Sequence, residues 1–270
     1  MFGKLIKNEF KNTWKYILVM SLTVIALSII GGLQMHMINH ESGALIYRFS
    51  QLYMGLYVIA MIVFQFIVAF FLMGRFYKKM FTTEGYLMHT LPVTVDEHIG
   101  SLLITGTIWS YFFVLVTLLS VYFCFVNGAD RASFEQAIHE MMKYYHVTGD
   151  TALMIVALIL GPFVSLLSAY CAMALGQLFK THRILGSVIM YIILMVAVST
   201  ISNYCMTGYV NQMTVRIDNY TYQDTVEGAV NLINDVFGTL GLFSLIAELV
   251  QGCVYWIITR LMITRKLDLQ

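Results

Sequence analysis

The sequence predicts an all-α polytopic membrane protein with six transmembrane helices. Hydrophobic residues make up 59% of the 270 residues and charged residues only 11%, against about 45–50% and about 25% in soluble domains. The charges fall in clusters, separated by five uncharged stretches of 25 to 32 residues and by a sixth stretch that holds only Glu248. A spanning helix needs about 20 apolar residues, and continuously apolar stretches do not alternate as the strands of a membrane barrel do.

We therefore expect a single transmembrane domain over residues 1–270. Its spans run over about residues 16–36, 51–74, 99–126, 151–179, 184–206 and 237–259. Little of the chain lies outside these spans, so there is little room for a second domain. The formal net charge of +1 gives no reason to expect nucleic acid as a partner.

The distribution of lysine and arginine predicts the orientation. Twelve of the sixteen basic residues fall before the first span, after the last, or in the loops after spans two and four. Positive charge favours the cytoplasmic side of a membrane, so we expect both termini in the cytoplasm. We expect a multi-pass protein of a plasma membrane, namely the inner (cytoplasmic) membrane of a bacterium.

Residues 1–15 have the pattern of an interfacial amphipathic helix. Apolar side chains gather on one face, and four lysines occupy an arc of about 80° on the other. The lysines that we expect at the membrane surface are Lys4, Lys7, Lys11 and Lys15. Such a helix lies along the inner surface, held by buried apolar area and by attraction to anionic lipid.

The cytoplasmic loop between spans two and three predicts a short helix of its own. Thr82 or Thr83 can cap this helix, and Pro92 forces a turn at its end. Thr94 or Asp96 can then start the third span. The short helix presents Leu, Met, Tyr and His side chains outward, a composition more typical of a docking surface than of a bare loop.

Two short motifs stand in this loop, Glu84-Gly85-Tyr86-Leu87 and Thr90-Leu91-Pro92-Val93-Thr94. In these residues the chain resembles the ABC-2 family of ABC-transporter permeases. The family's basic N-terminal helix, six spans and outer excursion between spans five and six are similar too. The resemblance implies that this stretch is the coupling helix that docks on an ATP-binding subunit, with His89 as a further contact residue. The family's charge-rich lead-in is reduced here to Arg75, Lys78 and Lys79.

The chain contains no phosphate-binding loop of the GxxxxGK[ST] type. We therefore expect a transport subunit rather than an enzyme, without a cofactor of its own, and with ATP and magnesium bound by a partner ATPase. The resemblance implies a second permease half, either the same chain or a sister permease. It also implies export of amphipathic or hydrophobic cargo, such as an antimicrobial peptide, a lipid or a drug.

Glu248 supports an alternative function. It is an ionisable residue well inside a span, with Gln251 about one turn later, and such residues are functional candidates by default. An ion-coupled secondary transporter would use it as the coupling group, whereas a structural interpretation gives it a hydrogen-bonded or cavity-lining role. No metal site is expected, because His139-Glu140 is followed by Lys143 where the zinc motif HExxH requires histidine. An intramembrane hydrolase is disfavoured, since the spans hold no paired ligands.

Three further features concern the outer loops and the fourth span. Residues 133–146 have the pattern of an amphipathic helix with a capping box from Ser133 to Gln136. The loop over residues 215–235 predicts a short helix or re-entrant hairpin that leads into the sixth span. Pro162, after Gly161, predicts a kink in the fourth span.

Overall fold

The computed structural model of the chain is all-helical throughout the residues that it describes, which are 2–38, 44–82, 93–128, 136, 139, 149–179, 182–220 and 226–266. Six long helices account for nearly all of these residues. They are α1 (Phe2–Ile38), α2 (Ala44–Phe81), α4 (Val95–Gly128), α6 (Gly149–Gly176), α7 (Arg183–Tyr220) and α8 (Val226–Lys266). All six are long and apolar enough to cross a membrane. The prediction of an all-helical chain with six helices of membrane-spanning length is thereby confirmed for the described residues.

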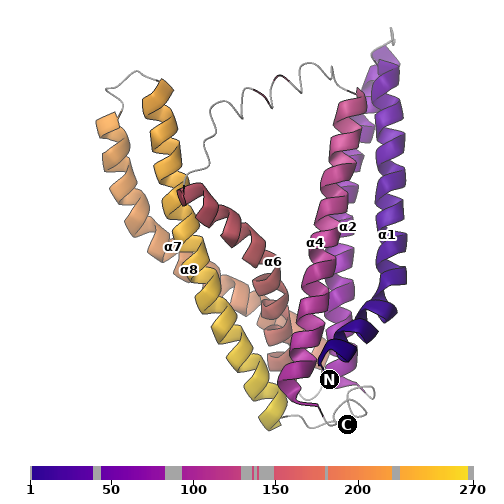
Figure 1. Cartoon of the computed structure of the whole chain (residues 1–270), viewed down its shortest axis with the longest axis vertical. Helices are drawn as coiled ribbons and strands as arrows, with labels where there is room; N and C mark the ends of the chain where they lie inside the picture. The colour runs from indigo at the N-terminus through magenta and orange to yellow at the C-terminus, as the bar shows by residue number, and fades with distance from the viewer. Residues whose placement is uncertain are drawn as a thin grey trace. The chain divides into compact units, whose positions relative to one another are not determined.

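Among the described helices, all but α6 are longer than the predicted spans. Each span lies within one helix, except that α6 ends at Gly176, three residues before the predicted end of the fourth span. The predicted interfacial helix, residues 1–15, and the first span form one continuous helix, which bends near its N-terminal end (Figure 1). In the described residues, α8 runs unbroken from Val226 into the sixth span without a re-entrant turn. Pro162 lies inside α6, whose ribbon changes direction part-way along (Figure 1).

The local chemistry explains where two of these helices begin and end. Thr94 directly precedes the first residue of α4, which places Asp96 and Glu97 in the first turn, where the helix dipole favours negative charge. Lys78 and Lys79 stand in the last turn of α2, where the dipole favours positive charge. The structure thus agrees with Thr94, of the two predicted starts, as the residue that begins the third span.

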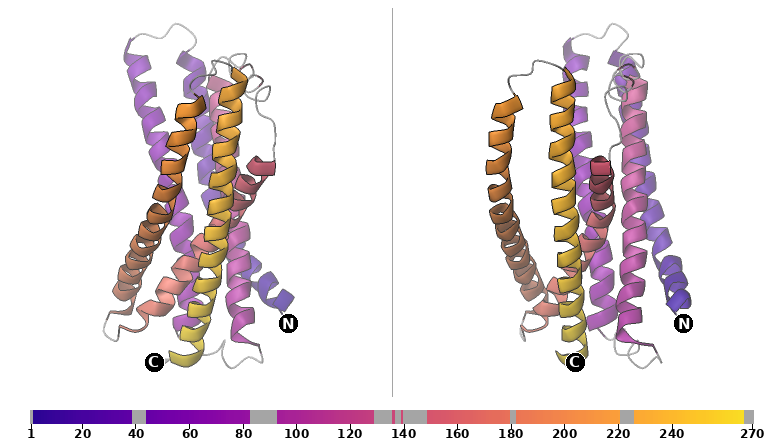
Figure 2. Two further views of the ribbon diagram at one scale, coloured as in Figure 1. Left: turned by 90° about the vertical axis from the view of Figure 1, so that its left-hand side faces the viewer. Right: turned by 60° about the vertical axis from the view of Figure 1, so that its left-hand side comes forward.

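The chain divides into two compact units, which are described separately. The first comprises Met1–Phe76 and Glu97–Tyr145, and the second Tyr77–Asp96 and His146–Gln270. In the first unit α1, α2 and α4 run side by side (Figures 1 and 2). Its core is formed by the buried side chains of Ile17, Val24, Tyr57, Met61, Val68, Leu72, Phe76, Ile99, Leu103, Phe113 and Val116.

Hydroxyl groups link the three helices of the first unit. Ser28 on α1 donates a hydrogen bond of 2.7 Å to the carbonyl oxygen of Ser120 on α4. The hydroxyls of Tyr57 on α2 and Ser120 also lie 2.7 Å apart, and Tyr53 donates to the carbonyl oxygen of Leu27. Within apolar surroundings a polar group must find a partner inside the protein, so these contacts fix the neighbouring helices in register.

In the second unit α6 is the central helix. It packs against both α7 and α8, which make few contacts with each other. In its second half, every residue from 166 to 174 is buried. This run is rich in small residues, which include Ala169, Ala172 and Ala174. Small side chains allow helix backbones to approach closely in a membrane. At its end, a Cβ atom placed on Gly176 would lie 2.5 Å from the backbone nitrogen of Ser187 on α7, so only glycine fits there.

Candidate functional site

The segment that resembles a coupling helix lies between α2 and α4. Its predicted contact residues are Glu84, Gly85, Tyr86, Leu87, His89, Thr90, Leu91 and Pro92, and they lie outside the described residues. The structure describes its two flanks, which are the end of α2 at Phe81 and the start of α4 at Val95. The short helix and its docking role therefore stay predictions.

The predicted membrane-surface lysines all lie on the first turns of α1. The side chains of Lys4, Lys7, Lys11 and Lys15 are exposed. On the opposite face Phe2, Leu5, Ile6 and Phe10 are half-buried, and Glu9 and Thr13 between them are buried. Contact of the lysines with an anionic lipid surface stays a prediction. The apolar face of this helix packs on protein.

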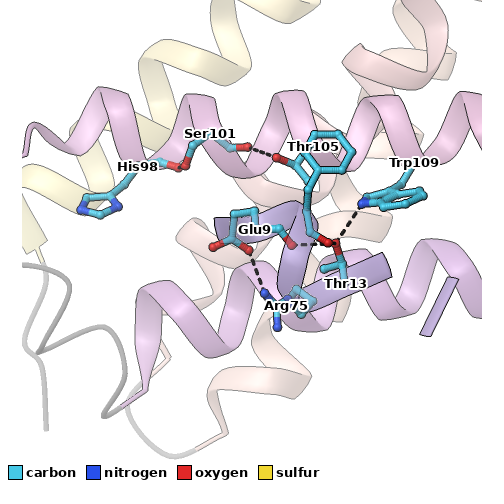
Figure 3. A network of polar contacts seen from close by, with 8 residues as sticks. Glu9, Thr13, Arg75, His98, Ser101, Thr105 and Trp109 are labelled. Atoms are coloured by element: carbon cyan, nitrogen blue, oxygen red, sulfur yellow. Dashed lines mark hydrogen bonds and ion pairs between the residues drawn. The ribbon is translucent and has the colours of Figure 1, made fainter. Parts of the chain in front are cut away.

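A buried ion pair is the centre of that protein contact. The Nη2 atom of Arg75 on α2 lies 2.7 Å from Oε2 of Glu9 on α1 (Figure 3). The side chain of Glu9 is 5% exposed and that of Arg75 is 21% exposed. Removing charges from water is costly unless they are paired, so each of these two residues depends on the other for its place in the fold. The ion pair joins the N-terminal part of α1 to the end of α2.

A second contact joins the same part of α1 to α4. The indole Nε1 of Trp109 donates a hydrogen bond of 2.8 Å to the hydroxyl of Thr13 (Figure 3). That hydroxyl in turn donates to the carbonyl oxygen of Glu9 at 2.8 Å. The rings of Phe10 and Trp109 pack with their centroids 5.2 Å apart. Glu9 and Thr13, one turn apart, therefore bind α2 and α4 respectively.

Glu9 and Arg75 were not among the predicted site residues, although the sequence carries a signal for Glu9. At 100° per residue, Glu9 stands opposite the centre of the lysine arc, in the middle of the apolar face. An acid in that position implies a partner within the protein. Arg75 falls three residues after the buried Leu72, on the stripe that α2 turns toward its neighbours.

The first turns of α4 carry a ladder of polar side chains. Ser101 donates to the carbonyl oxygen of His98, and Thr105 donates to that of Ser101 at 2.7 Å. All three residues are buried. The imidazole ring of His98 points away from the Glu9–Arg75 pair (Figure 3), so the ladder is not an extension of that pair.

Glu248 lies in the second unit, on the side of α8 that packs against α6. A Cβ atom placed on Gly161 of α6 would lie 3.6 Å from Oε1 of Glu248. The other oxygen, Oε2, is buried and has no hydrogen-bond partner among the described residues. The residue after Gly161 is Pro162, which has no backbone N–H to give to the preceding turn. The carboxyl group is thus held where α6 lacks both a side chain and one helical hydrogen bond.

The other α8 residues near α6 follow a regular spacing. A Cβ atom placed on Gly241 would lie 2.7 Å from the backbone nitrogen of Met154, and one placed on Gly252 would lie 3.7 Å from Val164. Further along, the side chain of Thr259 lies beside the buried Cys171 of α6. Because Glu248 falls on this stripe, it faces a protein neighbour. Gln251 is half-buried, and no hydrogen bond joins it to Glu248 in the described part of the chain.

Metal binding finds no support in the part of the chain that the structure describes. No three His, Cys, Asp or Glu side chains there come close enough to hold an ion.

A separate ion pair joins Arg260 of α8 to Asp96 at 3.1 Å, with both side chains substantially exposed. Exposed pairs of this kind contribute little to stability.

No protein-family model matches the chain, and neither a curated protein nor a solved structure matches it.

Proposed function

We propose that the chain is the membrane-spanning permease subunit of an ABC transporter that exports amphipathic or hydrophobic cargo. The observation that carries the proposal is the stretch from Glu84 to Thr94, which resembles the coupling helix of the ABC-2 family. It stands between α2 and α4 in a chain with six helices of membrane-spanning length. Since the sequence has no phosphate-binding loop, ATP and magnesium bind to a separate ATPase subunit.

The contacts of the first unit support a mechanical role for this stretch. Arg75 stands nine residues before Glu84 and is held by Glu9, and α1 is held to α4 through Thr13 and Trp109. A force applied at the end of α2 therefore acts on three helices that are tied together by an ion pair and a hydrogen bond. A docking ATPase would move this group as one body rather than bend a single helix.

The same ion pair narrows the choice of charged contacts for the ATPase. Of the basic residues before the coupling stretch, Arg75 is occupied by Glu9 and Lys79 is 7% exposed. Lys78 is exposed. Glu84 is therefore the charged residue proposed to contact the ATPase, beside Tyr86, Leu87 and His89.

The proposal includes a second permease half, cargo movement where the two halves meet, and both termini in the bacterial cytoplasm. Purification of the tagged chain from its native membrane in mild detergent, followed by mass spectrometry, tests it. A stoichiometric partner with a Walker A loop is the expected result, and a chain that purifies alone contradicts the proposal. The presence or absence of a second permease distinguishes a heterodimer from a homodimer.

Variants in the coupling stretch test the residue assignment. We expect Glu84→Lys and Tyr86→Ala to abolish coupled ATPase activity while the protein still inserts in the membrane. Tyr204→Ala is the matched control, because Tyr204 on α7 is 85% exposed and lies far along the chain from the stretch. Full coupling in both test variants would refute the assignment of this segment.

The position of Glu248 favours a second candidate, an ion-coupled secondary transporter. Its carboxyl group lies in the α6–α8 interface beside Gly161, with one buried oxygen that lacks a hydrogen-bond partner in the described residues. A proton or a cation would satisfy that oxygen. Under this candidate function, Glu248→Gln abolishes a pH-driven flux in proteoliposomes, and an unchanged flux eliminates it.

A further inference from the structure

One face of α2 carries an open groove. Its volume is about 490 Å³. Its lining residues recur every three or four positions and so fall on a single face of the helix. They are Arg48, Gln51, Leu52, Gly55, Leu56 and Ile59. The groove is polar at the Arg48 end and apolar along the rest of its length.

This face points away from the other helices of its own unit. Tyr57 and Met61, on the opposite side of α2, are buried, and Tyr57 contacts Ser120 of α4. Leu52, Leu56 and Ile59 are each more than half exposed. Gly55 leaves the gap between them, and a Cβ atom placed on it would meet nothing within 4 Å. The groove exists because a glycine interrupts a row of large side chains.

The length of α2 places the two ends of the groove at different depths in the membrane. Arg48 and Arg75 are 27 residues apart with no charged residue between them, which is about 40 Å of helix. A bilayer with its headgroup regions is about 40–45 Å thick. With Arg75 at one interface, Arg48 stands at the headgroup level of the other. Leu52 to Ile59 then lie within the hydrocarbon region.

We propose that this groove is a binding site for an anionic phospholipid. The guanidinium of Arg48 binds the phosphate, since arginine is well suited to phosphate oxygens. The amide of Gln51 donates to a phosphate or ester oxygen. One acyl chain lies along the helix over Gly55, between Leu52 and Leu56. The inference is independent of the proposed transport activity, because it rests on α2 alone.

The residues of the groove favour a lipid over a second copy of the chain. The centre of a protein interface is poor in charged residues, whereas this groove begins with Arg48. Close helix pairing in membranes uses small residues four positions apart, and the positions four before and after Gly55 are Gln51 and Ile59. A flexible acyl chain fills a single glycine gap that a second helix cannot enter.

Photo-crosslinking tests the site. The wild-type chain is placed in nanodiscs that contain a phosphatidylglycerol or a phosphatidylcholine with a diazirine in its acyl chain, at equal mole fractions. Labelling of the peptide that contains residues 49–59 is then measured by mass spectrometry. We expect about fivefold more label from phosphatidylglycerol, because one interfacial basic residue contributes about that factor to the binding of an anionic lipid.

Two variants separate the contributions of charge and shape. Arg48→Gln is expected to reduce labelling by phosphatidylglycerol to the level of phosphatidylcholine, whereas Arg260→Gln, the loss of another exposed arginine, leaves it unchanged. Gly55→Leu fills the groove and is expected to reduce labelling by both lipids several-fold. Its matched control is Gly74→Leu, also on α2, where an added Cβ likewise meets nothing within 4 Å.

Three results would overturn the proposal. One is equal labelling of the wild-type peptide by the two lipids. Another is loss of the label when soluble glycerol phosphate is added, which would indicate a site for the headgroup alone. The third is efficient disulfide crosslinking between two copies of a Leu56→Cys variant, which would show that a second chain covers this face.

Discussion

The two units each place a glutamate between helices, but they treat it in opposite ways. In the first unit Glu9 meets Arg75 at 2.7 Å, and the pair is largely shielded from solvent. In the second unit Glu248 meets a glycine, and its Oε2 is buried without a hydrogen-bond partner in the described residues. An acid whose charge is compensated holds a structure together. An acid that lies beside a helix irregularity without a partner for its charge is available to bind a proton or a cation. The two units are therefore expected to respond differently to mutation.

The largest expected effect follows from removing the compensation in the first unit. Arg75→Met removes the arginine that pairs with the buried carboxylate of Glu9, which is expected to cost about 3–5 kcal/mol of stability. Thermal unfolding in detergent, read from the loss of monodisperse protein, measures the change. The double variant Glu9→Gln with Arg75→Met is expected to recover most of the loss. A single variant as stable as wild type would show that Glu9 does not depend on Arg75.

The next effect tests how tightly the environment of Glu248 is packed. Gly241→Val brings a side chain against the backbone of Met154, where even a Cβ atom would approach to 2.7 Å. We expect a loss of about 1–3 kcal/mol, typical of overpacking. Gly208→Val on α7 is the matched control, since an added Cβ there meets nothing within 4 Å. Equal stability of the two variants would mean that α6 and α8 are not in close contact at Gly241.

A smaller effect is expected at the contact between α1 and α4. Trp109→Phe retains the ring packing against Phe10 but removes the hydrogen bond to Thr13. The loss of this hydrogen bond is expected to lower the free energy of unfolding by about 1 kcal/mol. A double-mutant cycle with Thr13→Val separates this hydrogen bond from the change in ring size. A coupling energy near zero would leave the ion pair as the main link of this helix end.

The smallest effect on stability is expected for Glu248→Gln. Glutamine has nearly the same shape and removes the charge that the site does not compensate, so the free energy of unfolding should change by less than about 1 kcal/mol. The same unfolding assay that is used for Arg75→Met gives a direct comparison. A loss as large as that of Arg75→Met would show that Glu248 is a structural acid after all, and the contrast between the two units would disappear.

The spacing of charges was sufficient to predict the number and the approximate positions of the helices. Backbone polar groups within hydrocarbon must find hydrogen-bond partners inside the chain, so a long uncharged stretch that crosses the membrane becomes a helix. Thr94 before Val95 illustrates the same predictability at the level of a single helix start. The extent of the helices was less predictable, because α1 and α8 continue well past the predicted spans into less apolar segments.

The candidate sites were predictable only as single residues. Glu248 was evident from its position within a span, and Glu9 could have been found from its place opposite the lysines. Their neighbours were not predictable, because the choice of Arg75 or Gly161 depends on which helices pack together and in what register. A hydrophobic pattern shows which face of a helix is buried, but it does not show what lies opposite that face.

The distance along the chain between Glu9 and Arg75 also constrains the order of events during biosynthesis. The two residues are 66 positions apart, and Thr13 and Trp109 are 96 apart. At a synthesis rate of about 5–20 residues per second, the ribosome adds Arg75 about 3–13 s after Glu9. Until then the nascent N-terminal helix carries Glu9 in the middle of its apolar face without the arginine that pairs with it. The first helix to be made therefore waits for arginine from the second, and a ribosome that stalls before residue 75 leaves Glu9 without Arg75.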